Sequence, residues 1–303
     1  MTNSLRKIET LVDGLSFTEV PRWHNGRLWF VDFYTYRVLA VDPDNPEQVE
    51  TVADIPEQPS GIGFLPDGDA LLVSMRDRRL IRRTADGALS EYADLSALAP
   101  WHLNDMVVDS QGRAWVGNFG FDLMAGKPMT ATNLIRVDPN GQATEVANGL
   151  RFPNGMVVAP DGNQLIVAET FGQQITAYDI GAHGNLSGKR AWAKLGPDPE
   201  TSDVMEFVGG AAFLPDGICL DAEGAVWAAD AGHNRVLRLA EGGEILDEIS
   251  TGDMGVFACM LGGDDGRTLF MCTAPSFNEE ERKSTREAAV KMVRVDVPSD
   301  GLP

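Results

Sequence analysis

The stretch ICLDAEGAVWAADAGHNRVLRLA, residues 218–240, shows the pattern that decides the fold. It contains three short apolar runs, at 218–221, 226–230 and 234–240, and a polar or glycine-containing turn separates each run from the next. Gly224 stands in the first turn, because a residue without a side chain readily adopts the positive φ that tight hairpins need. The stretch therefore predicts three consecutive antiparallel strands joined by hairpins.

The same unit occurs six times along the 303 residues. Each copy has a glycine in the turn before its second strand, and these are Gly26, Gly68, Gly112, Gly162, Gly224 and Gly266. Their mean spacing is about 48 residues, and four short strands at such a period are typical of propeller blades. We therefore predict an all-β fold, a six-bladed β-propeller of four-stranded antiparallel blades, as a single domain over residues 1–303.

The last copy of the unit lacks a fourth strand of its own. Its third apolar run lies at 290–296, close to the end of the sequence, whereas residues 6–12 precede the first copy and belong to no other. Pairing these two segments would close the ring and cover a free sheet edge. We expect this N-terminal strand to complete the last blade, and we expect helix only in the polar stretch 278–288.

Composition excludes several classes of function. Lys and Arg number 25 and Asp and Glu number 45, so the net charge is −20. Such a chain lacks the clustered basic residues that nucleic acids and anionic membranes require, and no apolar stretch is long enough to span a bilayer. Three cysteines without a metal-ligand spacing and an N-terminus without a signal-like apolar region predict a cytoplasmic protein. No obligate protein partner is evident.

Polar residues recur at the start of the first strand of five units. They lie eight residues before the turn glycine, or seven in the first unit, and we call them the first ring: Glu19, Ser60, Asn104, Asn154 and Asp216. First strands line the channel of a propeller, so these side chains should converge on its axis. Two carboxylates and two amides at one level provide the oxygen ligands that suit Ca²⁺. We expect Glu19, Asn104, Asn154 and Asp216 to hold one divalent cation, with Zn²⁺, Mn²⁺ and Mg²⁺ as alternatives to Ca²⁺.

A second ring of polar residues ends the second strands. Its members are Asp32, Ser74, Asn118, Glu169, Asp230 and Thr273. The loops that follow should lie on the same face of the propeller as the first ring. We expect most of these side chains to cap loops, and Asn118 and Asp230 to face the site.

Two long loops, 119–132 and 196–214, should frame the same face. They carry large apolar side chains that would form a rim above the polar floor, namely Phe119, Phe121, Met124, Met205, Phe207 and Phe213. Such a combination is typical of a pocket for a small molecule, although plain loop packing is the alternative. The sequence contains no motif for a Ser or Cys nucleophile, which favours chemistry that uses water.

Several motifs resemble the SMP-30/gluconolactonase/luciferin-regenerating-enzyme (LRE)-like family. They are Glu-x-Pro-x-Trp at 19–23, Asn104-Asp105, Phe-Pro-Asn-Gly at 152–155 and PDGICLDAEGAVWAAD at 215–230. The resemblance covers nearly the whole chain. It implies a six-bladed propeller with one catalytic divalent cation in its channel, often calcium, and hydrolysis of a lactone as the activity. Relatives in the family also hydrolyse organophosphates.

The resemblance implies a role for each matching residue. Glu19, Asn154 and Asp216 match metal ligands, and Asn104 matches a further ligand or an amide that binds substrate. Asp216 also matches the residue that acts as base or nucleophile. His102 stands where sugar-lactone members often carry arginine, which argues against a polyhydroxylated sugar lactone, and the apolar rim would also fit a less polar lactone. The residues expected to bind substrate are Asn104, His102, Asn118, Phe119 and Phe121.

Two other functions compete with the lactonase. Segment 218–239 also resembles an NHL repeat, a module of non-catalytic propellers that bind proteins or RNA. The net charge disfavours RNA, and a binding propeller has no need of an oxygen cage on its axis. The second alternative keeps the metal site and changes the reaction to phosphotriester hydrolysis.

Overall fold

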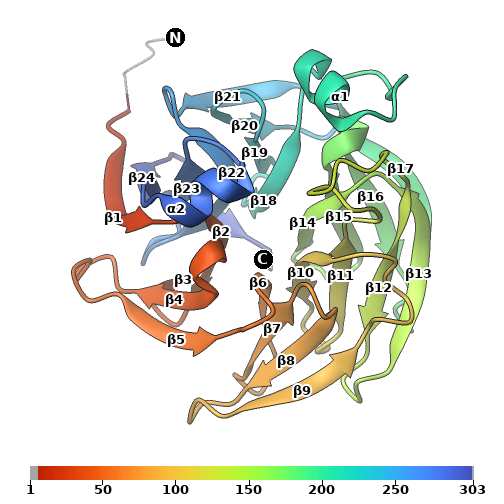
Figure 1. Cartoon of the computed structure of the whole chain (residues 1–303), viewed down its shortest axis with the longest axis horizontal. Coiled ribbons are helices and arrows are strands. Elements are labelled where there is room, and N and C mark those ends of the chain that lie inside the picture. The colour runs from red at the N-terminus through yellow and green to blue at the C-terminus, as the bar shows by residue number, and fades with distance from the viewer. Residues whose placement is uncertain (1–5, 302–303) are drawn as a thin grey trace.

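The structure is a computed structural model that describes residues 6–301, and Figure 1 shows six sheets arranged around a central channel. Blade one contains β2 (Thr18–His24), β3 (Arg27–Asp32), β4 (Arg37–Val41) and β5 (Glu50–Asp54). Blade two contains β6 (Pro59–Phe64), β7 (Ala70–Ser74), β8 (Arg79–Arg83) and β9 (Leu89–Asp94). Blade three contains β10 (Leu103–Val108), β11 (Ala114–Asn118), β12 (Thr132–Val137) and β13 (Ala143–Leu150).

The remaining blades repeat this antiparallel order. Blade four contains β14 (Pro153–Val158), β15 (Gln164–Glu169), β16 (Gln174–Ile180) and β17 (Leu186–Lys194). Blade five contains β18 (Pro215–Asp221), β19 (Val226–Asp230), β20 (Arg235–Leu239) and β21 (Ile245–Ser250). Blade six contains β22 (Gly255–Gly262), β23 (Thr268–Ala274) and β24 (Ala288–Arg294). The predicted six-bladed β-propeller is confirmed.

The N-terminal strand closes the ring. β1 (Glu9–Leu15) pairs antiparallel with β24, with Glu9 opposite Met292 and Leu15 opposite Ala288. The prediction that a segment before the first blade completes the last one is therefore confirmed, with the paired strand starting slightly later than residue 6. Closure covers the edge of β24 and makes β1 the outer strand of blade six.

The first strand of each blade is its innermost strand. β2, β6, β10, β14, β18 and β22 contact one another in sequence around the channel. Every residue of β14 and β18 is buried, whereas most of the outer strand β9 is exposed. This gradient explains the sequence pattern, because inner strands read as continuous apolar runs and outer strands alternate with polar residues.

A short strand at the end of the described chain was not predicted. β25 (Ser299–Asp300) pairs with β18 on the channel side, where Asp300 lies opposite Leu220. The Ser299 backbone N–H donates to the Gly266 carbonyl at 2.9 Å. β25 therefore lies at the end of the inner strands opposite to the first ring. Two isolated residues carry no periodicity, so sequence patterns give no signal for such a strand.

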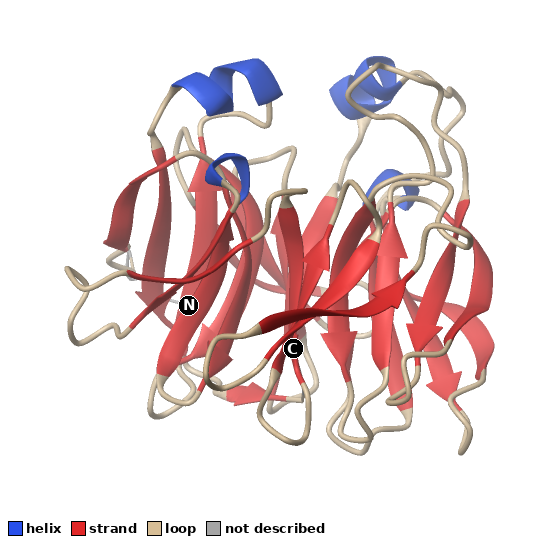
Figure 2. Ribbon diagram, turned by 60° about the horizontal axis from the view of Figure 1, so that its bottom comes forward, coloured by secondary structure: helices blue, strands red, loops and turns tan. Residues whose placement is uncertain are grey.

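All helices lie on one face of the propeller, as Figure 2 shows. They are α1 (Val204–Gly210), α2 (Glu279–Ser284) and two 3₁₀ turns, η1 (Phe33–Thr35) and η2 (Thr170–Gly172). α2 confirms the helix expected within 278–288, and its N-cap is Asn278, whose side chain accepts the Glu281 N–H at 3.0 Å. α1 was not predicted, because its sequence VMEFVGG is too short to show helical periodicity.

Candidate active site at one end of the channel

The five residues of the first ring come together around one cavity. The cavity has a volume of about 360 Å³ and lies on the helical face of the propeller. Glu19, Ser60, Asn104, Asn154 and Asp216 all line it, each from the inner strand of a different blade. The sixth blade contributes Phe257 instead of a polar residue. The predicted convergence of four potential metal ligands is therefore what the structure shows, while their role as ligands stays a prediction.

A local irregularity places each ring residue. In blades three, four and five the pairing of the inner strand with its neighbour shifts register directly after the strand's first residue, for example between Pro215 and Ile218. Such bulges bend a strand and redirect a side chain, and they are frequent beside active sites. A β-carbon added to Gly155 would lie 2.6 Å from the Asp216 carbonyl oxygen, and one on Gly217 only 2.4 Å from the Ala258 side chain. The glycines after Asn154 and Asp216 thus let adjacent inner strands approach closely.

Glu19 is held by a strained backbone. The next residue, Val20, has a φ of 51°, which is rare for a β-branched residue. The Val20 N–H donates to the Glu19 carboxylate at 3.2 Å. Left-handed backbone at such a residue costs about 1–3 kcal/mol and persists where the surroundings enforce it, commonly at functional sites.

The two ring amides direct their nitrogens away from the axis. Asn104 Nδ2 donates to the Pro153 carbonyl at 3.1 Å, and Asn154 Nδ2 donates to Thr170 Oγ1 at 3.3 Å. Thr170 in turn donates to the Pro215 carbonyl at 2.7 Å, which links blades four and five. Neither amide oxygen accepts a hydrogen bond from another described residue. Both oxygens therefore remain available to a ligand in the cavity.

The carboxylates of the ring have too few partners. Asp216 is 7% exposed, and its Oδ1 is buried without a hydrogen-bond partner among residues 6–301. Burial, followed by the charges of Glu19 and Asp105, raises the pKa of Asp216 well above its ordinary range. Burial, followed by the charge of Asp105, raises the pKa of Glu19 to about 8. Buried like charges of this kind are unfavourable when both are ionised, and a cation between them would relieve the repulsion.

Arg22 and Asp105 form an ion pair beside the ring that sequence reasoning missed. Arg22 is 3% exposed, and its Nη2 lies 2.6 Å from Asp105 Oδ1. The same guanidinium donates to the carbonyls of Ile62 at 3.0 Å and Met106 at 2.8 Å, so it joins the inner strands of blades one, two and three. The available signal was position, because Arg22 lies within Glu-x-Pro-x-Trp and Asp105 follows Asn104.

The donor set fits a cation that accepts neutral oxygen ligands. Within the part of the chain that the structure describes, no three His, Cys, Asp or Glu side chains gather closely enough to hold a metal ion. A cation at the first ring would therefore depend on the amide oxygens of Asn104 and Asn154 besides the carboxylates of Glu19 and Asp216. Mixed amide and carboxylate oxygens suit Ca²⁺ better than Zn²⁺, which prefers nitrogen and sulfur.

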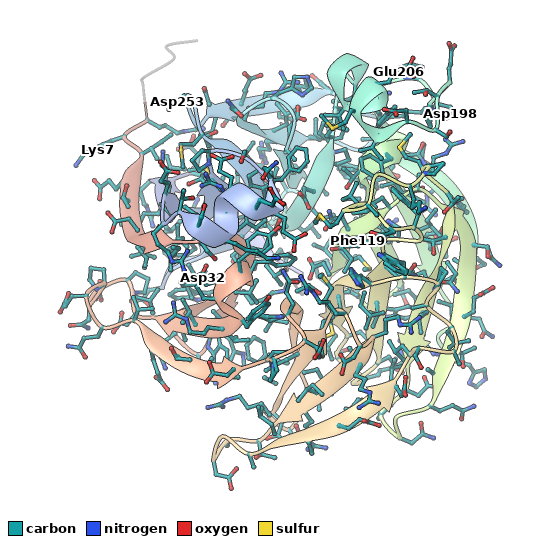
Figure 3. All side chains as sticks on the ribbon, viewed as in Figure 1. Lys7, Asp32, Phe119, Asp198, Glu206 and Asp253 are labelled. Atoms are coloured by element: carbon teal, nitrogen blue, oxygen red, sulfur yellow. The ribbon has the colours of Figure 1, made fainter. Side chains whose placement is uncertain are left out.

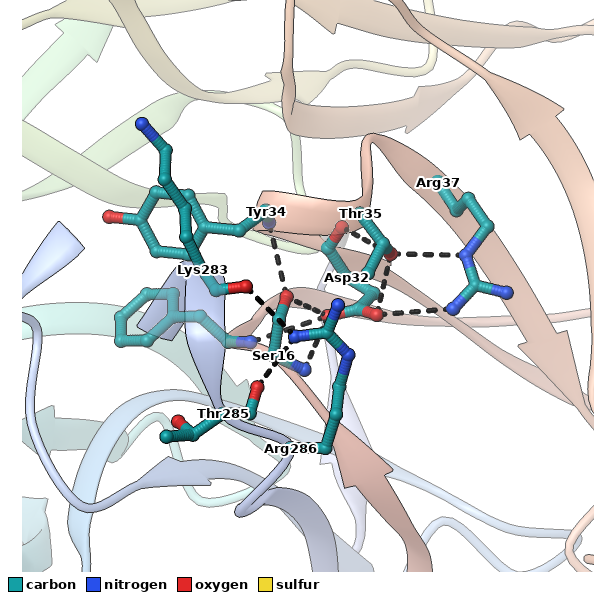
Figure 4. Close-up of polar contacts among 9 residues, drawn as sticks. Ser16, Asp32, Tyr34, Thr35, Arg37, Lys283, Thr285 and Arg286 are labelled. Carbon is teal, nitrogen blue, oxygen red and sulfur yellow. Dashed lines mark hydrogen bonds and ion pairs between the residues drawn. The ribbon is translucent and has the colours of Figure 1, made fainter. Parts of the chain in front are cut away.

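The second ring does not reach the cavity. Asp32 accepts the Ser16 N–H at 2.9 Å, the Thr35 hydroxyl at 2.6 Å and Arg37 Nη2 at 3.3 Å (Figure 4). Glu169 likewise accepts the Arg151 N–H at 2.7 Å. These side chains tie the loop that enters the blade to the loop after its second strand, as expected of caps.

The expectation that Asn118 and Asp230 face the site is wrong. Asp230 accepts the Leu214 N–H at 2.9 Å and pairs with Arg235 Nε at 2.9 Å. Asn118 is fully buried, donates to Asn133 Oδ1 at 2.8 Å and accepts from the Thr132 hydroxyl at 2.5 Å. The polar atoms of both side chains are hydrogen-bonded to neighbouring strands and loops, and neither side chain lines the cavity.

The residues predicted to bind substrate are only partly at the cavity. Phe119 lines it, and Figure 3 shows this side chain toward the centre of the ring. Phe121 lies one layer behind, against Phe152 and Phe171 at ring-centroid distances of 6.1 and 6.0 Å. His102 stacks on Trp101 at 4.9 Å and does not line the cavity.

The predicted apolar rim is also incomplete. Met124 lines the cavity, whereas Met205 points to solvent with 69% of its surface exposed. Phe213 and Phe207 are buried in the protein interior instead of at the rim. Other phenylalanines take their place, because the short loops after the second strands contribute Phe33 and Phe171. Loop length in the sequence was therefore a poor guide to which apolar side chains surround the ring.

Comparisons with known proteins agree with the fold and the motifs. The family model described as "SMP-30/Gluconolactonase/LRE-like region" matches residues 17–275. A pentonolactonase from Haloferax volcanii is 28% identical, with 94% of this chain and 92% of the relative covered. A 6-deoxy-6-sulfogluconolactonase from Pseudomonas putida is 27% identical, with coverage of 94% and 93%.

Solved structures show the same architecture. The calcium-binding protein regucalcin from Agrobacterium tumefaciens superposes with a TM-score of 0.79 at 19% identity, covering 98% of this chain and 97% of the other. A gluconolactonase from Xanthomonas campestris superposes with a TM-score of 0.70 at 22% identity, covering 98% and 90%. No helix in residues 6–301 is long and apolar enough to cross a membrane. The chain belongs to the SMP-30/gluconolactonase/LRE-like family.

Proposed function

We propose that this protein is a divalent-cation-dependent lactonase that opens a cyclic ester at the first ring. The observation that carries the proposal is the buried Asp216 Oδ1, which has no hydrogen-bond partner among the described residues yet lines a cavity with the four other oxygen-bearing side chains of the first ring. A buried carboxylate without a partner is costly, so the site is built for a ligand that compensates it. Relatives named as lactonases support the reaction class.

Four side chains would hold the cation, namely Glu19, Asn104, Asn154 and Asp216. Two carboxylates balance the charge of a dication, and the two amides add oxygen ligands without further charge. A bound divalent cation would supply Lewis-acid polarisation of the lactone carbonyl. Ca²⁺ is the expected ion because all four donors are oxygens.

Asp216 has the central chemical role in this proposal. As a general base, its carboxylate accepts a proton from the water that attacks the carbonyl carbon. As a nucleophile, it attacks that carbon itself, and water then releases the product acid. Either role requires an ionised carboxylate with a free oxygen, and Oδ1 provides that oxygen. Glu19 differs from Asp216 in that one of its carboxylate oxygens accepts the Val20 N–H.

One experiment separates this function from its two rivals. Purified protein is analysed for bound metal and then assayed with a panel of lactones and a paraoxon-like triester, before and after chelation. Lactone opening yields a carboxylic acid, so a pH indicator reports turnover. We expect about one cation per chain, lactone turnover that chelation abolishes and Ca²⁺ restores, and a lower melting temperature after chelation because the ligand binds the folded state.

The other outcomes are equally informative. Cleavage of the triester without opening of any lactone would assign phosphotriester hydrolysis to the same site. Bound cation without turnover of either substrate class would favour the non-catalytic binding propeller. Absence of bound cation together with unchanged melting temperature in chelator would contradict the oxygen cage.

A further inference from the structure

We infer that the substrate of this site is a neutral lactone with an apolar substituent, and not a polyhydroxylated or anionic lactone. The inference rests on the proposed function and concerns the walls of the cavity above the first ring. It follows from three properties of the residues that line the cavity: their charge, the hydrogen bonds that their polar atoms already make, and the apolar side chains that form the rest of the wall.

The first property is charge. Glu19 and Asp216 are the only charged side chains that line the cavity, and no Lys, Arg or His does so in the described chain. Lys283 lies near Tyr34, with Nζ 6.0 Å from the ring centroid, but it does not line the cavity and pairs with Glu279 at 2.5 Å. Recognition of a carboxylate, sulfonate or phosphate on a substrate requires a basic partner in the wall. An anionic lactone would therefore have no partner beyond the cation.

The second property is that most side-chain donors of the wall are already used, whereas the free oxygens belong to the first ring, which would hold the cation. The Ser60 hydroxyl donates to the Asn104 carbonyl at 3.0 Å, and the Thr170 hydroxyl donates to the Pro215 carbonyl at 2.7 Å. Ser276 Oγ donates to Glu281 at 2.6 Å.

Asn234 Nδ2 also donates within the protein, to the Gly252 carbonyl at 3.3 Å. Among the side-chain hydroxyls that line the wall, only that of Tyr34 has no hydrogen bond to a described residue. A sugar lactone would bury several hydroxyl groups in a wall whose own hydroxyls are mostly engaged and whose ring oxygens would ligate the cation, and unpaired buried hydroxyls weaken binding. A substrate with one polar ring and an apolar substituent avoids this loss.

The third property is the apolar surface itself. Phenylalanines from four blades line the cavity, among them Phe17, Phe119, Phe171 and Phe257. Phe257 occupies the position in blade six that is polar in the other five blades, and its ring lies 4.7 Å from that of Phe17. Met124 and Phe277 also line the cavity and are each 44% exposed, so they offer apolar surface to a ligand there.

A series of three lactones with the same ring size tests the inference. δ-Valerolactone is the unsubstituted ring, δ-decalactone adds a pentyl chain, and D-glucono-1,5-lactone carries hydroxyl groups. Each kcat/KM is divided by the uncatalysed rate constant at the same pH, because the rings differ in intrinsic reactivity. We expect δ-decalactone to exceed δ-valerolactone at least about tenfold, since each fully buried methylene contributes a factor of roughly four. We expect D-glucono-1,5-lactone to rank last.

A pair of double variants tests whether the apolar wall causes that preference. Met124→Ser with Phe277→Ser removes two exposed apolar side chains of the wall. Leu89→Ser with Leu246→Ser makes a matched change, because both leucines are 43% exposed on the outer strands β9 and β21, away from the cavity. The wall variant should lower the ratio of δ-decalactone to δ-valerolactone turnover at least about threefold, close to the loss of one buried methylene. The control should retain the wild-type ratio.

A binding measurement distinguishes failure of this inference from failure of the proposed function. Lactams are hydrolysed far more slowly than lactones, so 6-pentylpiperidin-2-one and piperidin-2-one report affinity without turnover. We expect tighter binding of the pentyl lactam, with a more negative heat-capacity change from apolar burial. Equal affinity of the two lactams, or D-glucono-1,5-lactone ranking first in turnover, would overturn the apolar substrate while leaving the lactonase standing. Preference for the pentyl lactam without turnover of any lactone would overturn the proposed reaction, and with it the identity of the substrate as a lactone.

Discussion

The first and second rings are two sets of buried or half-buried polar residues that recur from blade to blade and have different roles. Both lie at fixed positions of the repeated blade, and both contain carboxylates and amides. The oxygens of the second ring accept hydrogen bonds from backbone N–H groups and arginines, as Asp32 does from Ser16 and Arg37. Asp216 of the first ring instead keeps one carboxylate oxygen without a partner among the described residues.

The difference shows how a structural polar residue can be separated from a functional one. A buried carboxylate whose hydrogen-bonding capacity is filled stabilises the protein and has nothing left to offer a ligand. A buried carboxylate with unfilled capacity raises the free energy of the empty site, and a ligand that fills this capacity is bound correspondingly well. Proximity to the channel alone does not make the distinction, because both rings surround the same end of the propeller.

Replacement of Asp216 by Asn should have the largest effect on activity and little effect on the fold. The change keeps an oxygen and the side-chain volume but removes the charge and the basic oxygen. We expect lactone turnover at saturating cation to fall at least about 100-fold, the low end of what a general base contributes. Wild-type turnover in cation-loaded Asp216→Asn protein would show that Asp216 has only a structural role.

Replacement of Asp32 by Asn should produce the opposite result. The carboxylate is fully buried and accepts hydrogen bonds from Ser16, Thr35 and Arg37, so an amide would place donors against donors. We expect the free energy of unfolding in urea to fall by about 2–3 kcal/mol, while turnover per folded molecule falls far less than in Asp216→Asn. Asp253→Asn, the same change at an exposed turn, is the control and should leave stability unchanged. A stable Asp32→Asn variant that has lost turnover would contradict the conclusion that the second ring is structural and the first ring functional.

The pH dependence of stability gives the smallest effect and sharpens the comparison. Glu19 has a pKa of about 8 in the folded chain against an ordinary 4.5. Between these values the folded state holds a proton that the unfolded chain has lost, so stability must decrease as pH rises through this window. We expect the melting temperature of chelated protein to fall from pH 5 toward pH 8, and excess Ca²⁺ to oppose the fall because it binds the ionised carboxylates.

Variants assign this pH dependence to the first ring. Glu19→Gln removes one titrating group and lowers the repulsion on Asp216, so the fall in melting temperature should become shallower. Glu200→Gln makes the same change on an exposed loop and should leave the profile as in wild type. An unchanged profile in Glu19→Gln would place the titrating group elsewhere.

The fold was predictable because the same weak sequence pattern, a glycine turn between two apolar runs, recurs six times. One copy of a glycine turn between apolar runs could belong to many β-proteins, but six copies at a constant spacing indicate a propeller, and a missing last strand indicates closure by residues near the N-terminus. β25 and α1 escaped prediction because each is too short to show a period. Their positions depend on contacts with β18 and with the loops at the channel mouth, which no local pattern encodes.

The site was predictable where register alone decides, and not where hydrogen-bond partners decide. The bulge that contains the ring residue occurs at the same place in several blades, so Asn104, Asn154 and Asp216 could be aligned by counting from a glycine. Asn118 was misplaced because its amide is engaged by Thr132 and Asn133, two residues of the next strand that are ordinary in sequence. The Arg22–Asp105 pair was missed because a buried arginine and an exposed one look alike in sequence.

The pairing of β1 with β24 joins a strand that is synthesised early to one that is synthesised late. On a ribosome that adds roughly 5–20 residues per second, β1 is complete tens of seconds before β24 emerges. For that interval β1 has no native partner, and an unpaired strand is open to pairing with other chains. The exposed acidic side chains of Glu9 and Asp13 on β1 oppose such pairing by mutual repulsion between copies. The last blade is thus the slow and vulnerable step of synthesis, even though it is as well packed as the others once made.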